Sequence, residues 1–266
     1  MTSLLHRKSL LRAERLLIGA FALALAPNLS AQITAYEGFN YTPNTNLAGN
    51  DAPDPLTTWS GSATVDPAGL IFGSLQTSGQ SARASGGGRA FVGLGSTVDS
   101  GVQYLSFLGS NWGNDYAGLE LRVGTSSDSD VRLTAGLSND GRSGNQFTVA
   151  SNGTFAGSGI SRDDNTHLFV IKIDYTPEGT ATDVLSYWFD PTLDGFEPAT
   201  PTGTLTGDFA FTHIGLARFG TGAIPLFDEI RMGTTFAAVT PIPEPSSALL
   251  AIIGGAGMLL NRRRQR

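Results

Sequence analysis

The chain has 266 residues, no cysteine and a formal net charge of −6. The lack of cysteine excludes disulfides, a thiolate nucleophile and a cysteine-based zinc site, so a hydrophobic core must supply the stability. Residues 32–240 hold nine of the 17 basic and 21 of the 23 acidic residues, a net charge of −12. This charge argues against a nucleic-acid partner, because phosphate binding requires a basic face.

The first 31 residues have the composition of a secretory signal peptide. Basic side chains occur within the first 15 positions, an apolar run of eleven residues spans 16–26, and Pro27 ends it. This run is too short to cross a bilayer, and Ala31 is a small residue that suits signal peptidase. We therefore expect export with cleavage after Ala31, and a retained N-terminal anchor is the alternative.

Residues 32–240 are predicted to form one all-β domain. Apolar and polar residues alternate with the period of two that is typical of strands, as in Leu119 and Leu121 with Glu120 between them. By the same signs we expect strands at 33–38, 68–76, 89–94, 102–109, 119–123, 131–137, 146–150, 169–175, 185–189, 208–218 and 224–232. Only 234–239 could form a helical turn. So many short strands imply two packed antiparallel sheets, and the domain length favours a jelly roll.

Two adjacent acids, Asp228 and Glu229, invite a glycosidase interpretation. Glycoside hydrolysis requires two carboxylates about 5–10 Å apart around the scissile bond. Adjacent residues on a strand point to opposite faces, so we expect no such pair and assign Asp228 to tying the closing strand. His167 and His213 lack metal-binding spacing and are predicted to be structural. A Ser-His-Asp triad stays open as an alternative, although no nucleophile-turn motif frames a serine.

Oxygen-rich loops and tryptophans are the remaining ligand candidates. Calcium prefers six to eight oxygen ligands, and the candidate ligands are Asp128, Asp130 and Asp140. The alternative is that these side chains form solvated Asx turns. No other cofactor is indicated. Trp112, in a loop-like sequence, is the leading candidate for stacking on a sugar, with a core or loop-anchoring role as its alternative; Trp59 and Trp188 are weaker candidates.

The C-terminal residues 241–266 consist of three parts. These are Pro243-Glu244-Pro245, an apolar stretch at 248–260, and a basic end that contains Arg262, Arg263 and Arg264. Thirteen apolar residues fall short of the roughly 20 that span a bilayer. We therefore expect a short transmembrane helix that enters the membrane transiently, with its arginines held at the cytoplasmic face. A plain C-terminal anchor or a buried helix is the alternative.

These three parts, in this order, resemble the PEP-CTERM sorting signal of Gram-negative bacteria. The resemblance implies that an exosortase recognises the tail, cuts near Pro243-Glu244-Pro245, and releases the protein or transfers it to the envelope. It also implies a transient stay in the inner membrane, then a location at the cell surface or in the extracellular matrix. Proteins with this signal are associated with extracellular polysaccharide and biofilms.

Short segments of the central domain resemble concanavalin A-like (LamG-type) jelly rolls. Residues 167–174 and 183–191 are similar to a central hairpin of that fold, and 227–235 to its closing strand. Tyr36-Glu37-Gly38-Phe39 fits the opening strand, which would pair near the last one. We expect a signal peptide at 1–31, a concanavalin-like β-sandwich at 32–240 and a sorting signal at 241–266. The expected role is non-enzymatic, with carbohydrate contact as one candidate; a secreted polysaccharide hydrolase is the alternative.

Overall fold

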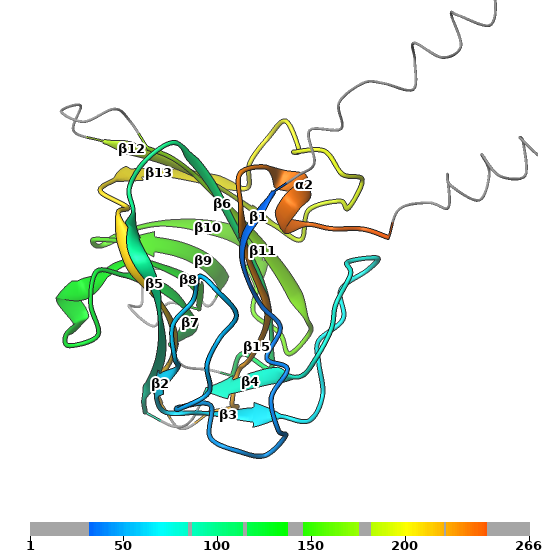
Figure 1. Ribbon diagram of the computed structural model, residues 1–266. Coiled ribbons are helices and arrows are strands. Elements are labelled where there is room, and N and C mark those ends of the chain that lie inside the picture. Colours follow the sequence, from blue (N-terminus) through cyan, green and yellow to red (C-terminus); the bar gives the residue numbers. More distant parts are fainter. Residues whose placement is uncertain are drawn as a thin grey trace, which may run out of the picture. The chain divides into compact units, whose positions relative to one another are not determined.

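The computed structural model describes residues 32–84, 87–113, 116–137, 146–175, 182–220 and 222–243. They form two antiparallel sheets packed face to face, which confirms the predicted all-β sandwich (Figure 1). The expected signal peptide and the tail beyond Pro243 lie outside the described residues. Within the described part, no helix is long and apolar enough to cross a membrane.

Sheet 1 contains both the first and the last strand of the domain. Its order is β13-β12-β11-β6-β15-β4-β3, and β1 also pairs with β15. The bounds are β1 Ile33–Glu37, β3 Ala63–Asp66, β4 Ser81–Ala84, β6 Val102–Ser110, β11 His167–Asp174, β12 Asp183–Phe189, β13 Gly203–Gly207 and β15 Leu226–Gly233. Tyr36 lies opposite Arg231, so the opening and closing strands pair as expected. Strands β11 and β12 form the expected hairpin.

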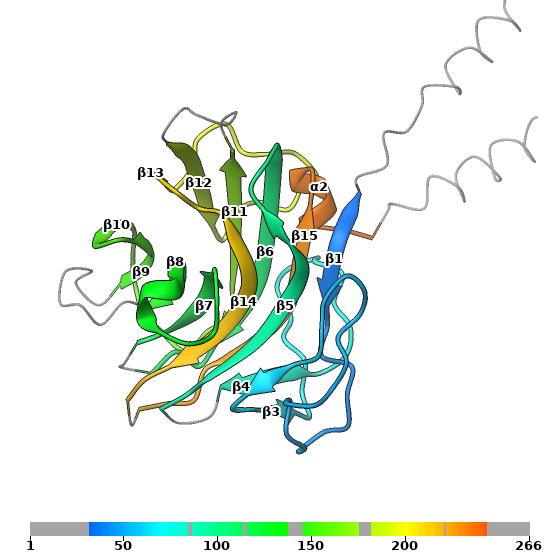
Figure 2. The same ribbon diagram turned by 60° about the vertical axis from the view of Figure 1, so that its left-hand side comes forward.

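Sheet 2 covers the other side of the sandwich. Its order is β10-β9-β8-β7-β14-β5-β2, and Figure 2 shows β14 between β7 and β5. The bounds are β2 Ser60–Gly61, β5 Arg89–Val98, β7 Ala117–Arg122, β8 Val131–Leu137, β9 Gln146–Ser151, β10 Thr154–Ser161 and β14 Phe211–Arg218. A 3-10 turn, η1 (Asp128–Asp130), joins β7 to β8, and the short helix α2 (Phe236–Val239) confirms the expected turn at 234–239.

Residues 67–80, which we call the cover segment, are the main departure from the expected strands. The sequence predicts a strand at 68–76, but this stretch has no strand pairing and runs from β3 to β4. Its apolar side chains Leu70 and Leu75 are buried against the outer face of sheet 1. The apolar pattern of this segment therefore reflects its burial against the outer face of sheet 1 and not pairing as a strand.

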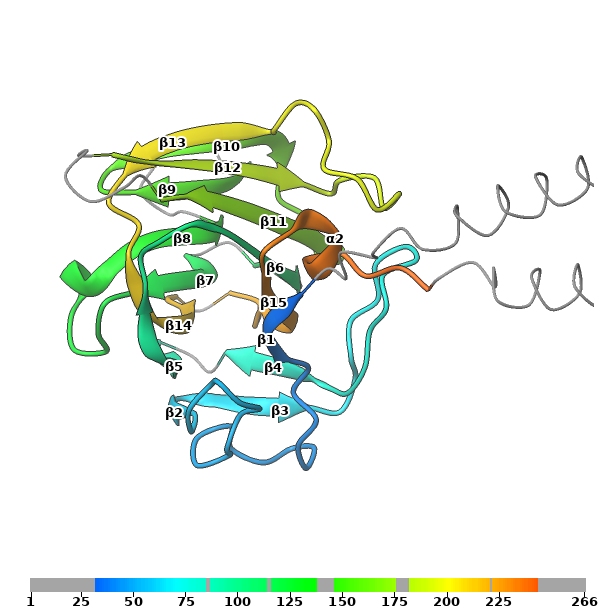
Figure 3. The same cartoon turned by 45° about the horizontal axis from the view of Figure 1, so that its top comes forward.

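Two hydrophobic clusters stabilise the sandwich. The main core lies between the sheets and includes the fully buried Trp59, Phe107, Phe147, Phe169 and Tyr187. A second cluster, the outer cluster, joins the outward side chains of sheet 1 to the cover segment and α2. Its members include Leu108, Leu168, Trp188, Leu70, Leu75, Phe236 and Val239. Each large side chain buried in this way contributes about 1.5–3 kcal/mol before entropy costs. Sheet 1 is thus packed on both faces (Figure 3).

Candidate functional site

Strand β15 contains a β-bulge at its two acids. Phe227 and Ile230 both belong to the main core, and Glu229 lies between them with a φ of 55°. The pairing of β15 with β6 changes register between Asp228 and Arg231. A bulge places two residues where a regular strand has one, so both acids face the cover segment. The expectation that Asp228 and Glu229 point to opposite faces is therefore wrong.

The bulge lies where β15 changes partners along one edge. Strand β4 pairs with β15 up to Phe227, and β1 pairs with it from Ile230 onward. The cover segment fills the gap between these two strands, and its backbone amides donate to the acids of the bulge. Side-chain carboxylates thus replace the main-chain partners that a neighbouring strand would supply.

Asp228 fixes the first part of the cover segment. Its Oδ2 accepts the N–H of Leu70 at 2.7 Å, and its Oδ1 accepts the N–H of Glu229 at 2.7 Å. Burial raises the pKa of Asp228 to about 8, and the nearby charge of Glu229 adds to this shift. The carboxyl group is therefore mostly protonated at neutral pH. This bears out the expected tying role, since the acid holds a neighbouring segment on the closing strand.

Glu229 fixes the second part of the cover segment. Its Oε1 accepts the N–H of Ser78 at 2.5 Å, and its Oε2 accepts the hydroxyl of Tyr36 at 3.0 Å. The guanidinium of Arg231 donates both to Glu229 and to the carbonyl of Gln76. Burial raises the pKa of Glu229, and the charge of Arg231 opposes that shift. Both carboxylate oxygens are engaged within the protein.

Three cavities share Ser78 in their walls, and Tyr36 lines two of them. Two have volumes of about 250 Å³, and one of these reaches Asp228 while the other reaches Arg231. The third has a volume of about 390 Å³, and we call it the tyrosine cleft. Its polar groups come from Tyr36, Asn40, Tyr41, Asp51 and Ser78. Both tyrosine rings are half-buried, whereas the amide, the carboxylate and the hydroxyl of the other three are exposed.

The tyrosine cleft is held in place by the buried acid Glu37. Its Oε2 accepts the hydroxyl of Tyr41 at 2.6 Å and the indole N–H of Trp59 at 2.8 Å. Its Oε1 accepts the N–H of Phe39 at 2.7 Å. Burial and the bond to Glu37 raise the pKa of Tyr41, so the phenol stays protonated. The wall of the cleft is therefore preorganised by a closed hydrogen-bond network.

The outer face of sheet 2 carries a second charged group, an ion-pair ladder. Glu120 accepts from Arg89 at 2.9 Å, from Arg122 at 2.6 Å and from the Tyr116 hydroxyl at 2.7 Å. Gly215 on β14 leaves room for these side chains, because a Cβ there would lie 3.2 Å from Cδ of Arg122. Every partner of Glu120 is internal, which indicates a structural role.

The loop after β7 contains two of the candidate calcium ligands. Asp128 pairs with Arg89 at 2.8 Å, and Asp130 accepts the N–H groups of Ser126 and Ser127, both at 2.9 Å. These amide bonds lower the pKa of Asp130. Asp140 lies outside the described residues. Among the residues that are described, no group of three or more His, Asp or Glu side chains could hold a metal ion.

The three tryptophans are buried. Trp112 is 1% exposed and makes edge contacts with Phe147 and Phe227, with ring centroids 5.4 and 5.9 Å apart. Gly109 permits this position, because a Cβ there would overlap the indole ring. The indole offers no exposed face to a sugar, so the prediction that Trp112 stacks on a sugar is wrong. Trp112 has the core role that was the alternative. Trp59 and Trp188 are likewise buried, and the Trp188 ring lies edge-on to Phe236 of α2 with the centroids 5.9 Å apart.

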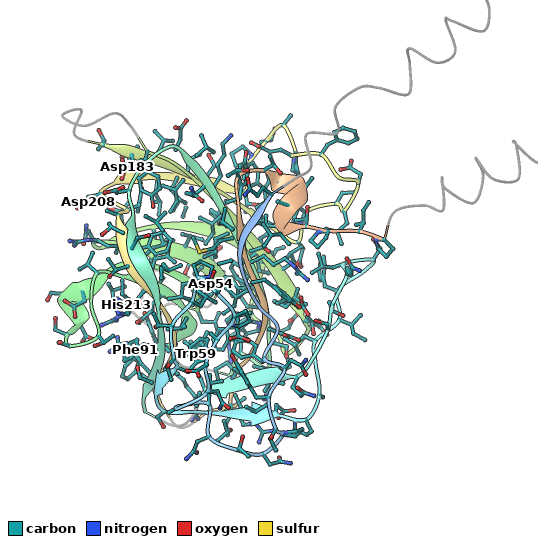
Figure 4. All side chains as sticks on the ribbon, in the orientation of Figure 1. Asp54, Trp59, Phe91, Asp183, Asp208 and His213 are labelled. Atoms are coloured by element: carbon teal, nitrogen blue, oxygen red, sulfur yellow. The ribbon has the colours of Figure 1, made fainter. Side chains whose placement is uncertain are left out.

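The two histidines differ in their surroundings. His167 bridges Asp190 at 2.6 Å and Asp163 at 2.8 Å; burial alone would lower its pKa, but these bonds outweigh that effect and raise it. His213 lies on β14 opposite Gly93 of the neighbouring strand β5 (Figure 4). Burial and the charge of Arg122 lower the pKa of His213. His167 therefore joins two loops, whereas His213 is neutral at pH 7.

The residues of the expected processing signals fall almost entirely outside the described part. Pro243 is the last described residue, and Ala31 lies just before the first. The remaining members of the sorting motif, Glu244, Pro245, Arg262, Arg263 and Arg264, also lie outside it. Their roles stay predictions from the sequence.

No family model matches this chain, and no curated protein matches it. Similar solved structures include an endo-β-1,4-glucuronan lyase from Trichoderma reesei, with 14% identity, 79% of this chain and 99% of that chain covered, and a TM-score of 0.44. Domain 4 of the arabinanase AbnA from Geobacillus stearothermophilus shares 15% identity over 79% of this chain and 97% of that chain, with a TM-score of 0.43. The carbohydrate recognition domain of Emp46p shares 9% over 75% of this chain and 99% of that one, with a TM-score of 0.44. Likeness at this level carries no conclusion about what this chain binds or does.

Proposed function

We propose that this protein is an exported, non-enzymatic β-sandwich that is sorted through its C-terminal tail and binds neutral polysaccharide in the tyrosine cleft. The observation that carries the binding role is the cleft itself. Two fixed tyrosine rings lie beside the exposed groups of Asn40, Asp51 and Ser78. Aromatic rings pack on the apolar face of a sugar, and the polar groups match its hydroxyls.

The charge of the domain favours a neutral polymer over an acidic one. Residues 32–240 carry a net charge of −12, and the cleft adds the exposed carboxylate of Asp51. Such a field repels polyanions and leaves neutral glycans unaffected. A neutral polysaccharide therefore fits both the cleft and its surroundings.

The hydrogen bonding of Asp228 and Glu229 supports binding without hydrolysis. Glycoside hydrolysis requires two carboxyl groups that flank the bond and are free to exchange protons with substrate. Asp228 and Glu229 instead accept main-chain and side-chain donors of the protein at every oxygen. Removing either would release the cover segment, which is the behaviour of a structural group.

One observation favours a hydrolase as the second candidate. Asp228 lines a cavity of about 250 Å³, and its pKa of about 8 leaves it protonated at neutral pH. A general acid needs this state. The two candidates differ in whether a bound polysaccharide is cut.

Incubation of purified residues 32–266, the chain expected after cleavage of the signal peptide, with a panel of neutral polysaccharides tests the proposal. We expect binding by calorimetry and no released reducing ends. The double change Asn40→Ala and Asp51→Ala should weaken binding about 5-fold or more, because it removes two hydrogen bonds worth about 0.5–1.5 kcal/mol each. Both side chains are exposed, and the hydrogen bond from the Thr58 hydroxyl to the Asp51 carboxylate lies at the surface, so folding should be unaffected.

The matched control is Asp99→Ala, an exposed acid in the turn between β5 and β6, which should bind as the unchanged protein does. Released reducing sugar would overturn the non-enzymatic role and favour the hydrolase. If no neutral polymer binds, or if the double change leaves affinity unaltered, the tyrosine cleft is not the site.

A further inference from the structure

Two bulky apolar side chains are exposed at the tips of loops. Ile71 in the cover segment is 74% exposed, and Phe196 in the connection between β12 and β13 is 75% exposed. Among the described residues, these are the most exposed large apolar side chains. Single exposed apolar residues are common in folded proteins and need no explanation. Ile71 and Phe196 indicate an interaction surface only if they lie on the same part of the molecule.

The two loops pack against each other on a common base. Phe72, which follows Ile71, and Leu193, three positions before Phe196, are both partly buried and pack against the outer cluster. A Cβ built on Gly73 would lie 3.6 Å from Cδ1 of Leu193. Figure 3 shows the cover segment, the β12–β13 connection and α2 on the same side of sheet 1. Ile71 and Phe196 are thus carried by one packed layer.

The chain leaves the sandwich beside this layer. The N–H of Gln76, in the cover segment, donates to the carbonyl of Pro241 at 2.8 Å. Ile33, 43% exposed, lines the same cavity as Gln76 and Pro241. The apolar stretch 248–260 begins five positions after Pro243. Five extended residues reach at most about 18 Å, so a membrane that holds this stretch lies close to the layer.

We propose that Ile71 and Phe196 insert into the surface of the bilayer that holds the C-terminal tail, an inference that rests on the proposed sorting function. Apolar side chains gain free energy by entering the headgroup boundary. An electrostatic contact is disfavoured, because a domain charge of −12 is repelled by anionic lipids. The sandwich is then held with its cover-segment side on the membrane, and the segment at Pro243 stays at the lipid surface.

The absence of cysteine makes a direct test feasible. Single variants Ile71→Cys and Phe196→Cys of residues 32–266 are labelled with a polarity-sensitive fluorophore and reconstituted into phosphatidylcholine vesicles. We expect a blue shift of emission at both positions and loss of emission when lipids carrying a quencher are included. The control is Ser129→Cys in η1, an exposed position on the sheet 2 side, which should show neither change.

Vesicle flotation separates the two proposals. If unlabelled residues 32–266 do not float with vesicles, the membrane role of the tail fails, and this inference fails with it. If the protein floats but labels at 71 and 196 behave like the label at 129, the sorting function survives and the insertion of the loop tips is refuted. Thermal unfolding of each labelled variant in detergent confirms that the fold is retained.

Discussion

A single backbone torsion, the φ of 55° at Glu229, brings two acids onto one face of β15. Positive φ is usually signalled by glycine, and the sequence has glutamate here, so strand alternation was the natural prediction. The same strand was correctly placed at 224–232. Sequence patterns therefore located the acids but missed their orientation, which depends on the change of partner strands beside them.

The protonation of Asp228 gives a prediction at the scale of one residue. An unfolded aspartate releases its proton near pH 4, whereas Asp228 in the folded protein holds it to about pH 8. Between these values the folded state binds more protons, so its stability falls as pH rises, by up to about 1.4 kcal/mol per pH unit. Asp228→Asn does not titrate, so urea denaturation between pH 5 and pH 8 should show a flatter dependence.

The raised pKa of His167 also makes stability fall as pH rises. This effect is the same in the unchanged protein and in Asp228→Asn, so the difference between their slopes reports on Asp228. Its stabilising pairs are complete below the unfolded histidine pKa and are lost as pH rises through the folded one. The exposed Asp99→Asn is the control and should keep the unchanged slope. Equal slopes for Asp228→Asn and the unchanged protein would refute a protonated Asp228.

Most of the long strands were predictable because they bury apolar side chains in the main core. The expected strands at 131–137 and 102–109 match β8 and β6 to within a residue. The sequence does not predict the short strands β2, β3, β4 and β13, since two to five residues carry too little alternation. It also does not predict β10, which has eight residues but none that is buried. The sequence predicts a strand in the cover segment because this stretch contains apolar residues such as Leu70 and Leu75. In the structure these side chains are buried in the outer cluster without any strand pairing.

The ion-pair ladder gives a prediction at the scale of elements, because it joins β5, β7 and the loop after β7. Glu120 is fully buried, and Arg122 is 1% exposed. Glu120→Gln removes the nearer counter-charge of the buried Arg122 and leaves it only Asp130, whose Oδ2 lies 3.9 Å away. The change should reduce the free energy of unfolding by up to about 3–5 kcal/mol. Chemical denaturation measures the change.

The matched control is Asp128→Asn, which breaks the pair between Arg89 and an 86% exposed carboxylate. A pair exposed to this degree contributes about 0–1 kcal/mol, so little change is expected. A loss of less than about 1 kcal/mol for Glu120→Gln, equal to the control, would show that the ladder does not hold the loop on sheet 2.

At the scale of the whole molecule, the candidate site forms where the chain closes on itself. Strand β1 supplies Tyr36 and Glu37, β15 supplies the two acids, and the connection from β3 to β4 lies over both. The pairing of first and last strands was expected from their resemblance to opening and closing strands, and Tyr36 opposite Arg231 confirms it. The cleft itself was not predicted, because its groups come from three segments whose contacts arise only after closure.

The sorting of the protein is a property of the whole chain, and it gives the last prediction. Two prolines around Glu244 disfavour a helix, so the sequence predicts an extended stretch here, a form in which a membrane protease can bind the main chain. Changing Pro243, Glu244 and Pro245 to alanine should block processing, so that the intact mass of the exported protein retains the tail. Cell fractionation should then find it in the inner membrane rather than at the surface.

Pro241→Ala, two positions before the motif, is the matched control and should be processed normally. A triple variant with the mass and location of the unchanged protein would show that the tail is not the sorting signal.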